Sequence, residues 1–380
     1  MSAYGRNNII FVGRFVESEI LTGPEKFSKR IFENIRSWVP SVTVLFIQYF
    51  FDGRKHSLRE KMFGFLETEY NGLKVYRAGL FSFYRLLKKL KPAIIHITVF
   101  ERFAVIALLY SLLNRTKIVY TCNGVVRYEN SELKKVSFLY RLKDSICERL
   151  LFRFSDTIVF PSGAAYELAK EYFDNVDIKG AVIPHGIDDI FVHASKNPVQ
   201  SFETGKKLKA VFIYKNELNA SGLNFLKDLL KAAGSKFTLY IICQNDINFK
   251  GINADITLIK PMNTYDLAEF YRDKDIFLSL NEYDTFSISA IEAMASGVIP
   301  VVTNQTGMSI FITNEINGYK IEFGDTTTLT EVIGKLQLMG TKEHMIIKQK
   351  ATTIYERWNW HKAAGTYLHE YRQLTGDLYD

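Results

Sequence analysis

Short apolar segments alternate with helix-length amphipathic segments along nearly the whole chain, and this alternation restricts the fold more than any other feature of the sequence. In the first half the predicted strands are Ile9–Gly13, Val42–Tyr49, Leu73–Ala78, Ala93–Ile97, Lys117–Thr121, Thr157–Pro161 and Ala181–Pro184. The predicted helices between them include Glu25–Trp38, Phe103–Leu113, Leu133–Phe154 and Ala164–Phe173. Continuous apolar strands separated by helices are typical of a parallel sheet that is covered on both faces.

The same pattern starts again in the second half. Its predicted strands are Lys209–Tyr214, Thr238–Cys243, Ile256–Lys260, Ile276–Leu280 and Ile299–Val302, and its predicted helices include Ser221–Ala233, Tyr265–Tyr271 and Ser287–Ala295. The polar stretch from His193 to Lys207 lacks periodicity and contains Pro198, so we interpret it as a linker. We therefore predict an α/β protein with two Rossmann-like, doubly wound parallel-sheet domains that face a central cleft, where such sheets bind ligands.

Length and composition agree with two ordered domains. The chain has 380 residues, of which 47% are hydrophobic and 23% are charged. Its three cysteines, Cys122, Cys147 and Cys243, have no paired spacing, which favours a reducing cytoplasm over a disulfide framework or a zinc site. No signal peptide is predicted, and the apolar stretch Phe103–Leu113 is well short of the roughly 20 residues that span a membrane.

Positive charge is concentrated in the first half. Residues 1–190 hold 28 Lys and Arg against 20 Asp and Glu, a net charge of +8, and the remainder brings the total to +7. This half is the one suited to a polyanion or an anionic membrane surface. No nucleic-acid recognition motif is present, so nucleic acid is not predicted as a partner. Lysines scattered over a solvated surface are the alternative explanation.

The segment from Asn281 to Val302 carries the chemistry. It is predicted to form a strand end, a polar loop with Asp284, a helix with Glu292, a stop at Gly297 and another strand. The spacing of Glu292 puts its carboxylate beside the apolar face, where it needs hydrogen-bond donors such as sugar hydroxyls. The N–H groups at the helix start, those of Phe286, Ser287 and Ile288, are predicted to be free to bind a phosphate. Together these groups fit a nucleotide sugar.

This segment resembles the E-x(7)-E motif of glycosyltransferase family 4, with Asp284 in place of the first Glu and Glu292 as the second. Further resemblances to that family run along the chain, at Thr22-Gly23-Pro24-Glu25, Phe160-Pro161-Ser162, Val182-Ile183-Pro184-His185-Gly186-Ile187-Asp188, Asn317-Gly318-Tyr319 and Trp358-Asn359-Trp360. The resemblance therefore covers essentially the whole sequence.

The resemblance implies a GT-B fold and a retaining sugar transfer without an obligatory metal ion or other cofactor. It implies an acceptor domain at 1–190, a donor domain at 205–360, and a last helix, about 361–380, that returns to the first domain. Asp284 and the amides that follow it would hold the donor sugar, and Glu292 the ribose. Gly23 in the N-terminal glycine loop would also contact the donor, and Met262 would lie against the nucleobase, although a plain loop is an equal alternative for Met262.

Several working positions depart from the family pattern. Asn216 and Ser221 stand where Arg and Lys usually meet the charge of the diphosphate, and Lys215 is the nearby replacement that we assign to catalysis. Asn123 occupies the place of a frequent His, and can hydrogen-bond but not titrate. Thr285 and Ser287 replace glycines that are common in the loop.

Other residues have competing interpretations. Asp273-Lys274-Asp275 looks like a D-x-D metal motif but is better explained as a helix-to-strand turn. Glu101, after the strand Ala93–Ile97, is a weak candidate for the acceptor site. His185 either faces the cleft or caps the strand, and the structural role is favoured. For the pair Trp358 and Trp360, a packing role against the last helix is favoured over a platform for a sugar. A further set of basic and apolar side chains spans 134–153, which fits a core helix with a basic outer face, or, less favoured, a surface helix on anionic lipid.

The resulting prediction is a cytoplasmic glycosyltransferase, peripheral at the inner membrane face if its acceptor is lipid-linked. It would move a sugar with retention from a nucleotide-sugar donor to a saccharide or lipid-linked saccharide, in surface polysaccharide synthesis by analogy. The alternative is a catalytically lapsed carbohydrate-binding or chaperone-like partner on the same scaffold. A nucleotide-sugar epimerase is disfavoured by the segment that contains Asp284 and Glu292.

Overall fold

The computed structural model describes residues 8–18, 20–49, 56–133, 136–195, 205, 207–215, 220–234 and 237–376. The chain forms two compact units. The first contains residues 1–184 together with 360–380, and the second contains residues 185–359. The α9 helix (Asp189–Ser195) occupies the start of the predicted linker, and the remainder of that linker lies largely outside the described residues.

The first unit is built on an eight-stranded sheet in the order β3-β4-β2-β1-β5-β6-β7-β8. Its strands are β1 (Ile9–Val12), β2 (Val44–Tyr49), β3 (Phe65–Tyr70), β4 (Leu73–Ala78), β5 (Ile94–Ile97), β6 (Lys117–Thr121), β7 (Thr157–Phe160) and β8 (Gly180–Val182). All neighbouring strands run parallel except β3, which pairs antiparallel with β4. The sequence prediction did not include β3, because its exposed and alternating residues lack the continuous apolar run of the other strands.

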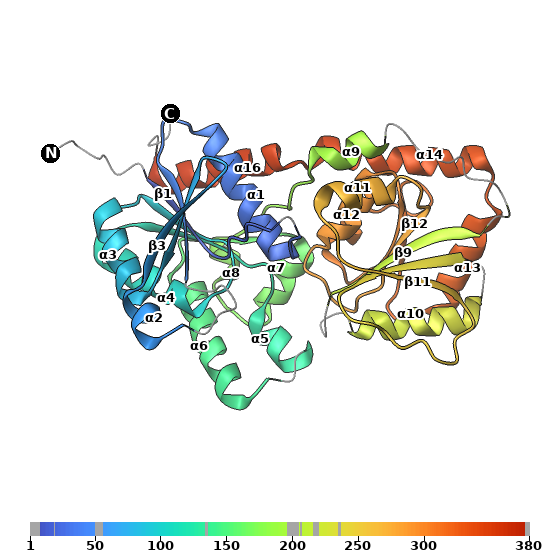
Figure 1. Ribbon diagram of the computed structural model, residues 1–380, viewed down its shortest axis with the longest axis horizontal. Helices are drawn as coiled ribbons and strands as arrows, with labels where there is room; N and C mark the ends of the chain where they lie inside the picture. Colours follow the sequence, from blue (N-terminus) through green and yellow to red (C-terminus); the bar gives the residue numbers. More distant parts are fainter. Residues whose placement is uncertain are drawn as a thin grey trace. The chain divides into compact units, whose positions relative to one another are not determined.

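Helices cover both faces of this sheet, and they are best followed in Figure 1. They are α1 (Gly23–Trp38), α2 (Leu58–Phe63), α3 (Leu80–Leu90), η1 (Arg102–Ala104), α4 (Val105–Asn114), α5 (Val126–Tyr128), η2 (Glu129–Leu133), α6 (Phe138–Phe154), α7 (Gly163–Lys170), α8 (Val176–Lys179) and α16 (Trp360–Thr375). Alternate residues of β1 point to opposite faces: Ile10 and Val12 join a core with α3, α4 and α6, whereas Ile9 and Phe11 join a core with α1 and α16.

The final helix belongs to the first unit although it follows the whole second unit in sequence. In Figure 1, α16 lies beside α1, and the two helices are in contact. Trp360, at the start of α16, is buried and its ring lies 6.2 Å from that of Phe27. The packing role predicted for Trp360 is therefore confirmed. Trp358 lies in the second unit, where its ring is 5.6 Å from that of Phe311.

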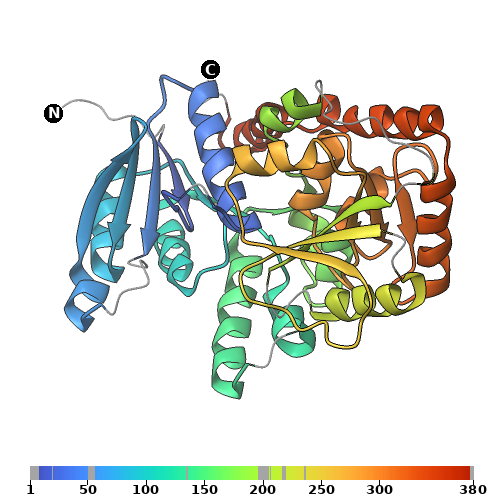
Figure 2. The same cartoon turned by 45° about the vertical axis from the view of Figure 1, so that its right-hand side comes forward.

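The second unit is built on a six-stranded parallel sheet in the order β11-β10-β9-β12-β13-β14. Its strands are β9 (Leu208–Tyr214), β10 (Phe237–Cys243), β11 (Asp255–Ile259), β12 (Ile276–Ser279), β13 (Ile299–Thr303) and β14 (Tyr319–Ile321). Its helices are α9, α10 (Ala220–Ala233), α11 (Thr264–Tyr271), α12 (Ile288–Ala295), η4 (Gly307–Phe311), α13 (Thr326–Leu338), α14 (Thr341–Thr352) and α15 (Ile354–Arg357). Figure 1 and Figure 2 both show α10 on one side of the sheet with α11 and α12 on the other. The predicted class, two parallel-sheet α/β domains, is confirmed.

The helix predicted at Leu133–Phe154 differs from the structure in its packing. It is α6, which begins at Phe138, and the residues Lys134 and Lys135 lie outside the described part of the chain. Only its second half contributes to the core, chiefly through Leu151 and Phe152. The favoured interpretation as a core helix is thus wrong for its first half, where large apolar side chains are exposed. Periodicity alone could not show this, because an apolar stripe has the same spacing whether or not a neighbour covers it.

Candidate functional site

In the second unit, the loop that follows β12 is organised by Asp284. Its Oδ1 accepts hydrogen bonds from the backbone N–H groups of Phe286 at 3.1 Å and Ser287 at 2.9 Å. Its backbone oxygen also accepts from the N–H of Gly307 at 2.8 Å. Two of the three N–H groups predicted to be free for a phosphate are therefore engaged by Asp284. The acidic side chain takes the position that an external anion would occupy at a helix start.

Ser287 has a backbone conformation that favours glycine. Its φ is 66° and its ψ is 67°, which is left-handed, and its Oγ lies 3.1 Å from that of Ser279. A non-glycine residue in this region costs on the order of 1 kcal/mol, and this hydrogen bond helps to hold it there. The structure thus gives a reason why glycine is common in this loop of the family that the sequence resembles.

A narrow cavity brings together three of the predicted residues of the second unit. Lys215 directly follows β9, and it lines this cavity with Asp284 and Ser287. β9 and β12 are neighbours in the sheet, so the segments after their carboxyl ends meet at one edge. The volume of about 20 Å³ suits one small polar group, and Lys215 is the single cation among the described residues that line it. Asn216 lies outside the described residues.

The start of α10 approaches the same loop closely. A Cβ on Gly222 would lie 2.7 Å from Oδ1 of Asn281, which itself lines the cavity. Only glycine lets the helix start so near this side chain. Ser221, which replaces the lysine usual in the family, is therefore the neighbour of a residue that packs against the cavity wall.

Glu292 is buried within α12, with 3% of its surface exposed. Burial, and then the nearby charge of Glu292, raise the pKa of the Tyr271 phenol well above its ordinary value. Glu292 is not among the described residues that line the narrow cavity, and neither are Phe286, Ile288 or Met262. Phe286 instead packs in the core beside His185, with ring centroids 5.0 Å apart, and Met262 packs on the edge of the same core.

His185 has the structural surroundings that the sequence predicts. It is buried, and burial lowers the pKa of its imidazole to about 3. A neutral ring against Phe286 supports the segment that leads into α12. The imidazole thus contributes to packing under ordinary conditions rather than to charge.

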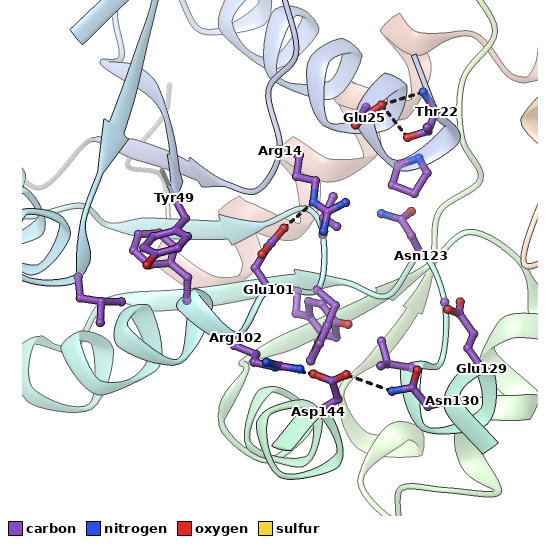
Figure 3. Close-up of a pocket in the computed structure, with 18 residues that line it drawn as sticks. Arg14, Thr22, Glu25, Tyr49, Glu101, Arg102, Asn123, Glu129, Asn130 and Asp144 are labelled. Carbon is purple, nitrogen blue, oxygen red and sulfur yellow. Dashed lines mark hydrogen bonds and ion pairs between the residues drawn. The ribbon is translucent and has the colours of Figure 1, made fainter. Parts of the chain in front are cut away.

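A larger cavity, of about 680 Å³, lies in the first unit and is shown in Figure 3. It is lined at the carboxyl ends of parallel strands: Arg14 follows β1, Glu101 follows β5 and Asn123 follows β6. Nε of Arg14 donates to Oε1 of Glu101 at 2.5 Å. A Cβ on the preceding Gly13 would come within 2.1 Å of Oγ1 of Thr98, so glycine is needed for the chain to pass here.

A second polar group lines the floor of this cavity. Nε of Arg102 donates to Oδ1 of Asp144 at 2.7 Å, and Nδ2 of Asn130 donates to Oδ2 of the same carboxylate at 3.1 Å. These residues come from η1, α6 and η2, and Figure 3 shows them converging. Sequence reasoning missed this group because its members are far apart along the chain. Arg14 was also missed, although its place directly after a strand and a glycine was a usable signal.

The predicted residues of the first unit have distinct positions. Asn123 lines the cavity, and its Nδ2 donates to the backbone oxygen of Thr98 at 2.7 Å. Glu101 lines it through the pair with Arg14. Gly23 is the first residue of α1, between Thr22 and Pro24, which do line it. The Glu25 carboxylate reaches back to the N–H of Thr22 at 2.9 Å and closes the start of this helix.

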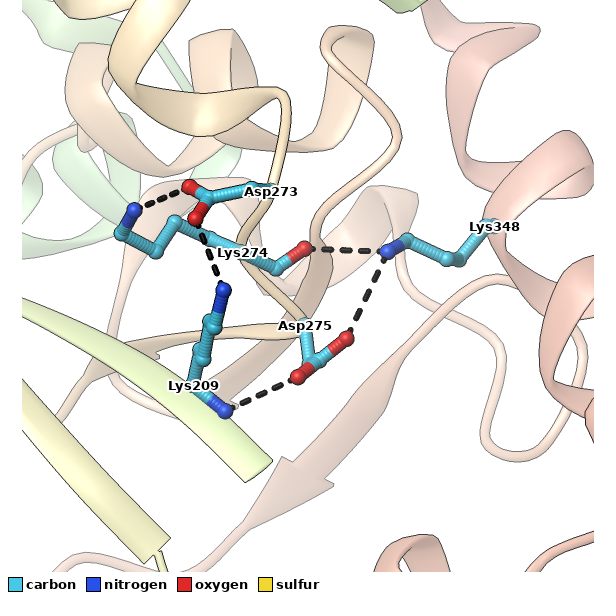
Figure 4. A network of polar contacts seen from close by, with 5 residues as sticks. All are labelled: Lys209, Asp273, Lys274, Asp275 and Lys348. Carbon is cyan, nitrogen blue, oxygen red and sulfur yellow. Dashed lines mark hydrogen bonds and ion pairs between the residues drawn. The ribbon is translucent and has the colours of Figure 1, made fainter. Parts of the chain in front are cut away.

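The D-x-D-like sequence is a turn in a network of ion pairs, shown in Figure 4. It joins α11 to β12, as predicted. Asp273 pairs with Lys209 at 2.8 Å and with the adjacent Lys274, and Asp275 pairs with Lys348 at 3.7 Å. Because lysines surround both carboxylates, their negative charge is already compensated. Over the described ranges, no cluster of three or more His, Cys, Asp or Glu side chains suits a metal ion.

Two properties of the described chain bear on its chemistry and surroundings. Its cysteines Cys122, Cys147 and Cys243 are all free, and burial raises the pKa of each thiol. No helix within the described ranges is both long enough and apolar enough to cross a bilayer.

Comparison with known proteins supports one family. Residues 226–353 match the family model of glycosyl transferases group 1, and residues 47–190 match that of Glycosyltransferase Family 4. An uncharacterized 41.2 kDa protein in the cps region of Klebsiella pneumoniae is 22% identical over 66% of this chain and 70% of its own length. The GDP-mannose:cellobiosyl-diphosphopolyprenol alpha-mannosyltransferase of Xanthomonas campestris is 20% identical over 33% of each chain, so only a third of that relative is spanned.

Among solved structures, HepE from Anabaena in complex with UDP and glucose superposes with a TM-score of 0.70. The match has 16% identity and covers 96% of this chain and 99% of the other. At this identity the likeness establishes the fold.

Proposed function

Because this chain belongs to the GT-B glycosyltransferases and is similar to family 4, we propose that it transfers a sugar, with retention, from a nucleotide-sugar donor to a saccharide or lipid-linked saccharide. The observation that carries this proposal is the narrow cavity of the second unit. It brings Lys215 to the same edge of the sheet as the loop held by Asp284. A cation beside a polar loop is what a departing diphosphate requires.

In this proposal each residue of the second unit has one role. Lys215 meets the diphosphate charge, and Glu292 accepts hydrogen bonds from the ribose. Asp284 keeps the loop in shape through Oδ1, while Oδ2, whose contact with Asn281 is a long 3.4 Å, accepts from the donor sugar. Since Lys215 supplies a positive charge beside this cavity, we propose that no metal ion is obligatory.

The larger cavity of the first unit is the proposed acceptor site. Its volume falls in the range of small-molecule sites, and its polar groups converge from separate elements. Arg14, Glu101 and the Asp144 carboxylate offer donors and acceptors suited to sugar hydroxyls. Asn123 can orient an acceptor hydroxyl but cannot take its proton, so the departing phosphate oxygen is the proposed proton acceptor.

The setting that we propose is surface polysaccharide synthesis at the inner face of the membrane. The Xanthomonas relative is named for a diphosphopolyprenol acceptor. An acceptor with a polyprenol tail is held in a bilayer, so an enzyme that uses it works at the membrane surface.

Donor binding can be tested by a thermal-shift screen against UDP-, GDP-, ADP- and TDP-sugars. A ligand that binds only the folded protein raises its melting temperature. At a ligand concentration one hundred times Kd, the added free energy of unfolding is about 2.7 kcal/mol. We expect one nucleotide class to stabilise the protein. Lys215→Ala and Glu292→Gln should each weaken binding of that donor at least tenfold, because the first removes the cation and the second replaces a charged acceptor by a weaker, neutral one.

Lys250→Ala is the matched control, since Lys250 is an exposed lysine in a loop of the same unit. The control should bind like the parent protein. Unchanged donor affinity and turnover in Lys215→Ala would remove the role assigned to this lysine. Product analysis by NMR then reports the anomeric configuration, and inversion would contradict the proposed retention.

A catalytically lapsed binding partner remains the second candidate function. It is favoured by one observation, that Lys215 is the single cation among the described residues of the narrow cavity. This alternative predicts that no nucleotide sugar stabilises the folded protein, or that one binds without turnover whatever acceptor is offered.

A further inference from the structure

Helices α4 and α6 form neighbouring parts of one layer on the first sheet. They are in contact with each other, and Ala107 and Leu108 of α4 share a core with Leu151 and Phe152 of α6. The apolar side chains on their inner sides are therefore buried in the core against the sheet. The outer sides of the two helices take no part in this core, so the core does not require apolar side chains there.

These two helices also carry large exposed apolar side chains, which with their neighbouring cations we call the α4–α6 surface. The main ones are Leu109, Leu112, Leu113, Phe138, Leu139 and Ile146. Leu113 and Phe138 each have 75% of their surface exposed. Single exposed leucines are common on proteins, but a group of this kind on two adjacent helices marks an interaction site.

Within the described residues of α4, its C-cap residue and α6, every exposed charged side chain is positive. The exposed charged side chains of α4, its C-cap residue and α6 are Arg115, Arg141, Lys143, Arg149 and Arg153. The two acidic side chains of α6 point elsewhere. Asp144 pairs with Arg102, and Glu148 is buried against the N–H groups of Val126 and Arg127. Apolar and cationic side chains thus alternate without an exposed acid among the described residues of either helix.

We propose that the α4–α6 surface docks the protein on an anionic lipid bilayer. The apolar side chains enter the interface between headgroups and acyl chains, while the arginines and lysines extend toward lipid phosphates. The bilayer fits better than a second protein chain, because a protein interface that buried these leucines would also desolvate five cations for which the described residues of α4 and α6 supply no exposed acid. This inference gives a structural basis to the proposed location at the membrane, and it is independent of the sugar transferred.

Vesicle flotation with the full-length protein tests the proposal directly. We expect the protein to float with vesicles of phosphatidylcholine and phosphatidylglycerol and to remain below vesicles of phosphatidylcholine alone. Reversing the charges of Arg141 and Lys143 together should lower the partition coefficient by well over tenfold, since each basic residue contributes roughly fivefold. Leu113→Glu should lower it about tenfold by removing apolar area from the interface.

Matched controls come from the second unit. Leu338 is exposed to the same 75% as Leu113, so Leu338→Glu introduces an equal change outside the α4–α6 surface. Lys342→Glu is the corresponding control for charge, at an exposed lysine of α14. Both controls should float like the parent protein. Circular dichroism and the donor thermal shift, which should not change in any of these variants, verify that each one is folded.

Three results would overturn the inference. They are failure of the parent protein to bind anionic vesicles, equal binding by Leu113→Glu, and a parent dimer that Leu113→Glu converts to monomer without any vesicle binding. The last result would assign the surface to a second copy of the chain. Because the donor thermal shift is recorded on the same samples, loss of membrane docking and failure of the proposed enzyme function give different outcomes.

Discussion

At the scale of single residues, burial and hydrogen bonds set the pKa of an ionisable side chain. Glu148 is fully buried, and its two oxygens accept from the N–H groups of Val126 at 2.6 Å and Arg127 at 2.8 Å. Burial nevertheless raises the pKa of this carboxyl to about 7, because two hydrogen bonds offset only part of the desolvation. No sequence pattern marked Glu148, since its importance arises from what covers it.

Glu148 should make stability depend on pH near neutrality. A carboxyl whose pKa is raised on folding stabilises the folded state below its unfolded value of about 4.3, and this contribution is lost as pH rises through about 7. Relative to Glu148→Gln, we expect the parent protein to gain on the order of 1 kcal/mol of unfolding free energy between pH 8 and pH 6. Urea unfolding at the two pH values measures it, and an equal pH response in both proteins would refute the assignment.

At the scale of elements, the narrow cavity depends on where strands and helices end. Lys215 follows β9 and Asp284 follows β12, so the parallel register of these neighbouring strands brings the two residues together. The sequence was sufficient to predict both strands and the helix that starts at Ile288. It was not sufficient to show that Asp284 bonds the N–H groups of Phe286 and Ser287, because that depends on the fold of the loop.

The α16 helix is an element whose contribution to stability can be measured. Leu368 is buried between α16 and the first sheet, whereas His369, the next residue, is exposed. We expect Leu368→Ala to destabilise the first unit by about 2–5 kcal/mol through the lost burial and the cavity left behind. His369→Ala should change the unfolding free energy by less than about 0.5 kcal/mol.

Hydrogen exchange locates the effect of the Leu368 substitution. Peptides from β1 and α1 should exchange faster in Leu368→Ala, while those from α10 and α13 of the second unit should not change. If hydrogen exchange became faster by the same factor in both units, the conclusion that α16 stabilises only the first unit would be wrong.

At the scale of the whole molecule, each unit contains histidine that must stay neutral. Burial lowers to about 3 the pKa of His96 in the first unit and of His185 and His344 in the second. In His96, Nε2 lies 2.8 Å from Oγ1 of Thr121 and Nδ1 lies 2.6 Å from the hydroxyl of Tyr371. This network joins β5, β6 and α16 within the first unit.

Both units should therefore lose stability in mild acid. A histidine with a depressed pKa stabilises the fold above its unfolded value of about 6.5, and this contribution is lost as pH falls toward 3. At pH 5.5 each such histidine should cost about 1.4 kcal/mol relative to high pH. Unfolding of the Glu148→Gln variant at pH 7.5 and 5.5 tests this without the opposing carboxyl, and equal stability at the two values would contradict it.

The sequence by itself determined the fold class, the main strands of both sheets, the Asp273–Asp275 turn and the order of strand, loop and helix between Ile276 and Ala295. Each of these follows from local spacing, since strand and helix periodicity and turn chemistry are properties of neighbouring residues. The tertiary structure decided the two cavities and the hydrogen-bonded group of Arg102, Asp144 and Asn130. It also decided the raised pKa of Glu148 and the exposure of apolar side chains on α6. These features depend on which distant segments cover or meet each other, and a side chain's burial and partners are set only when those segments pack.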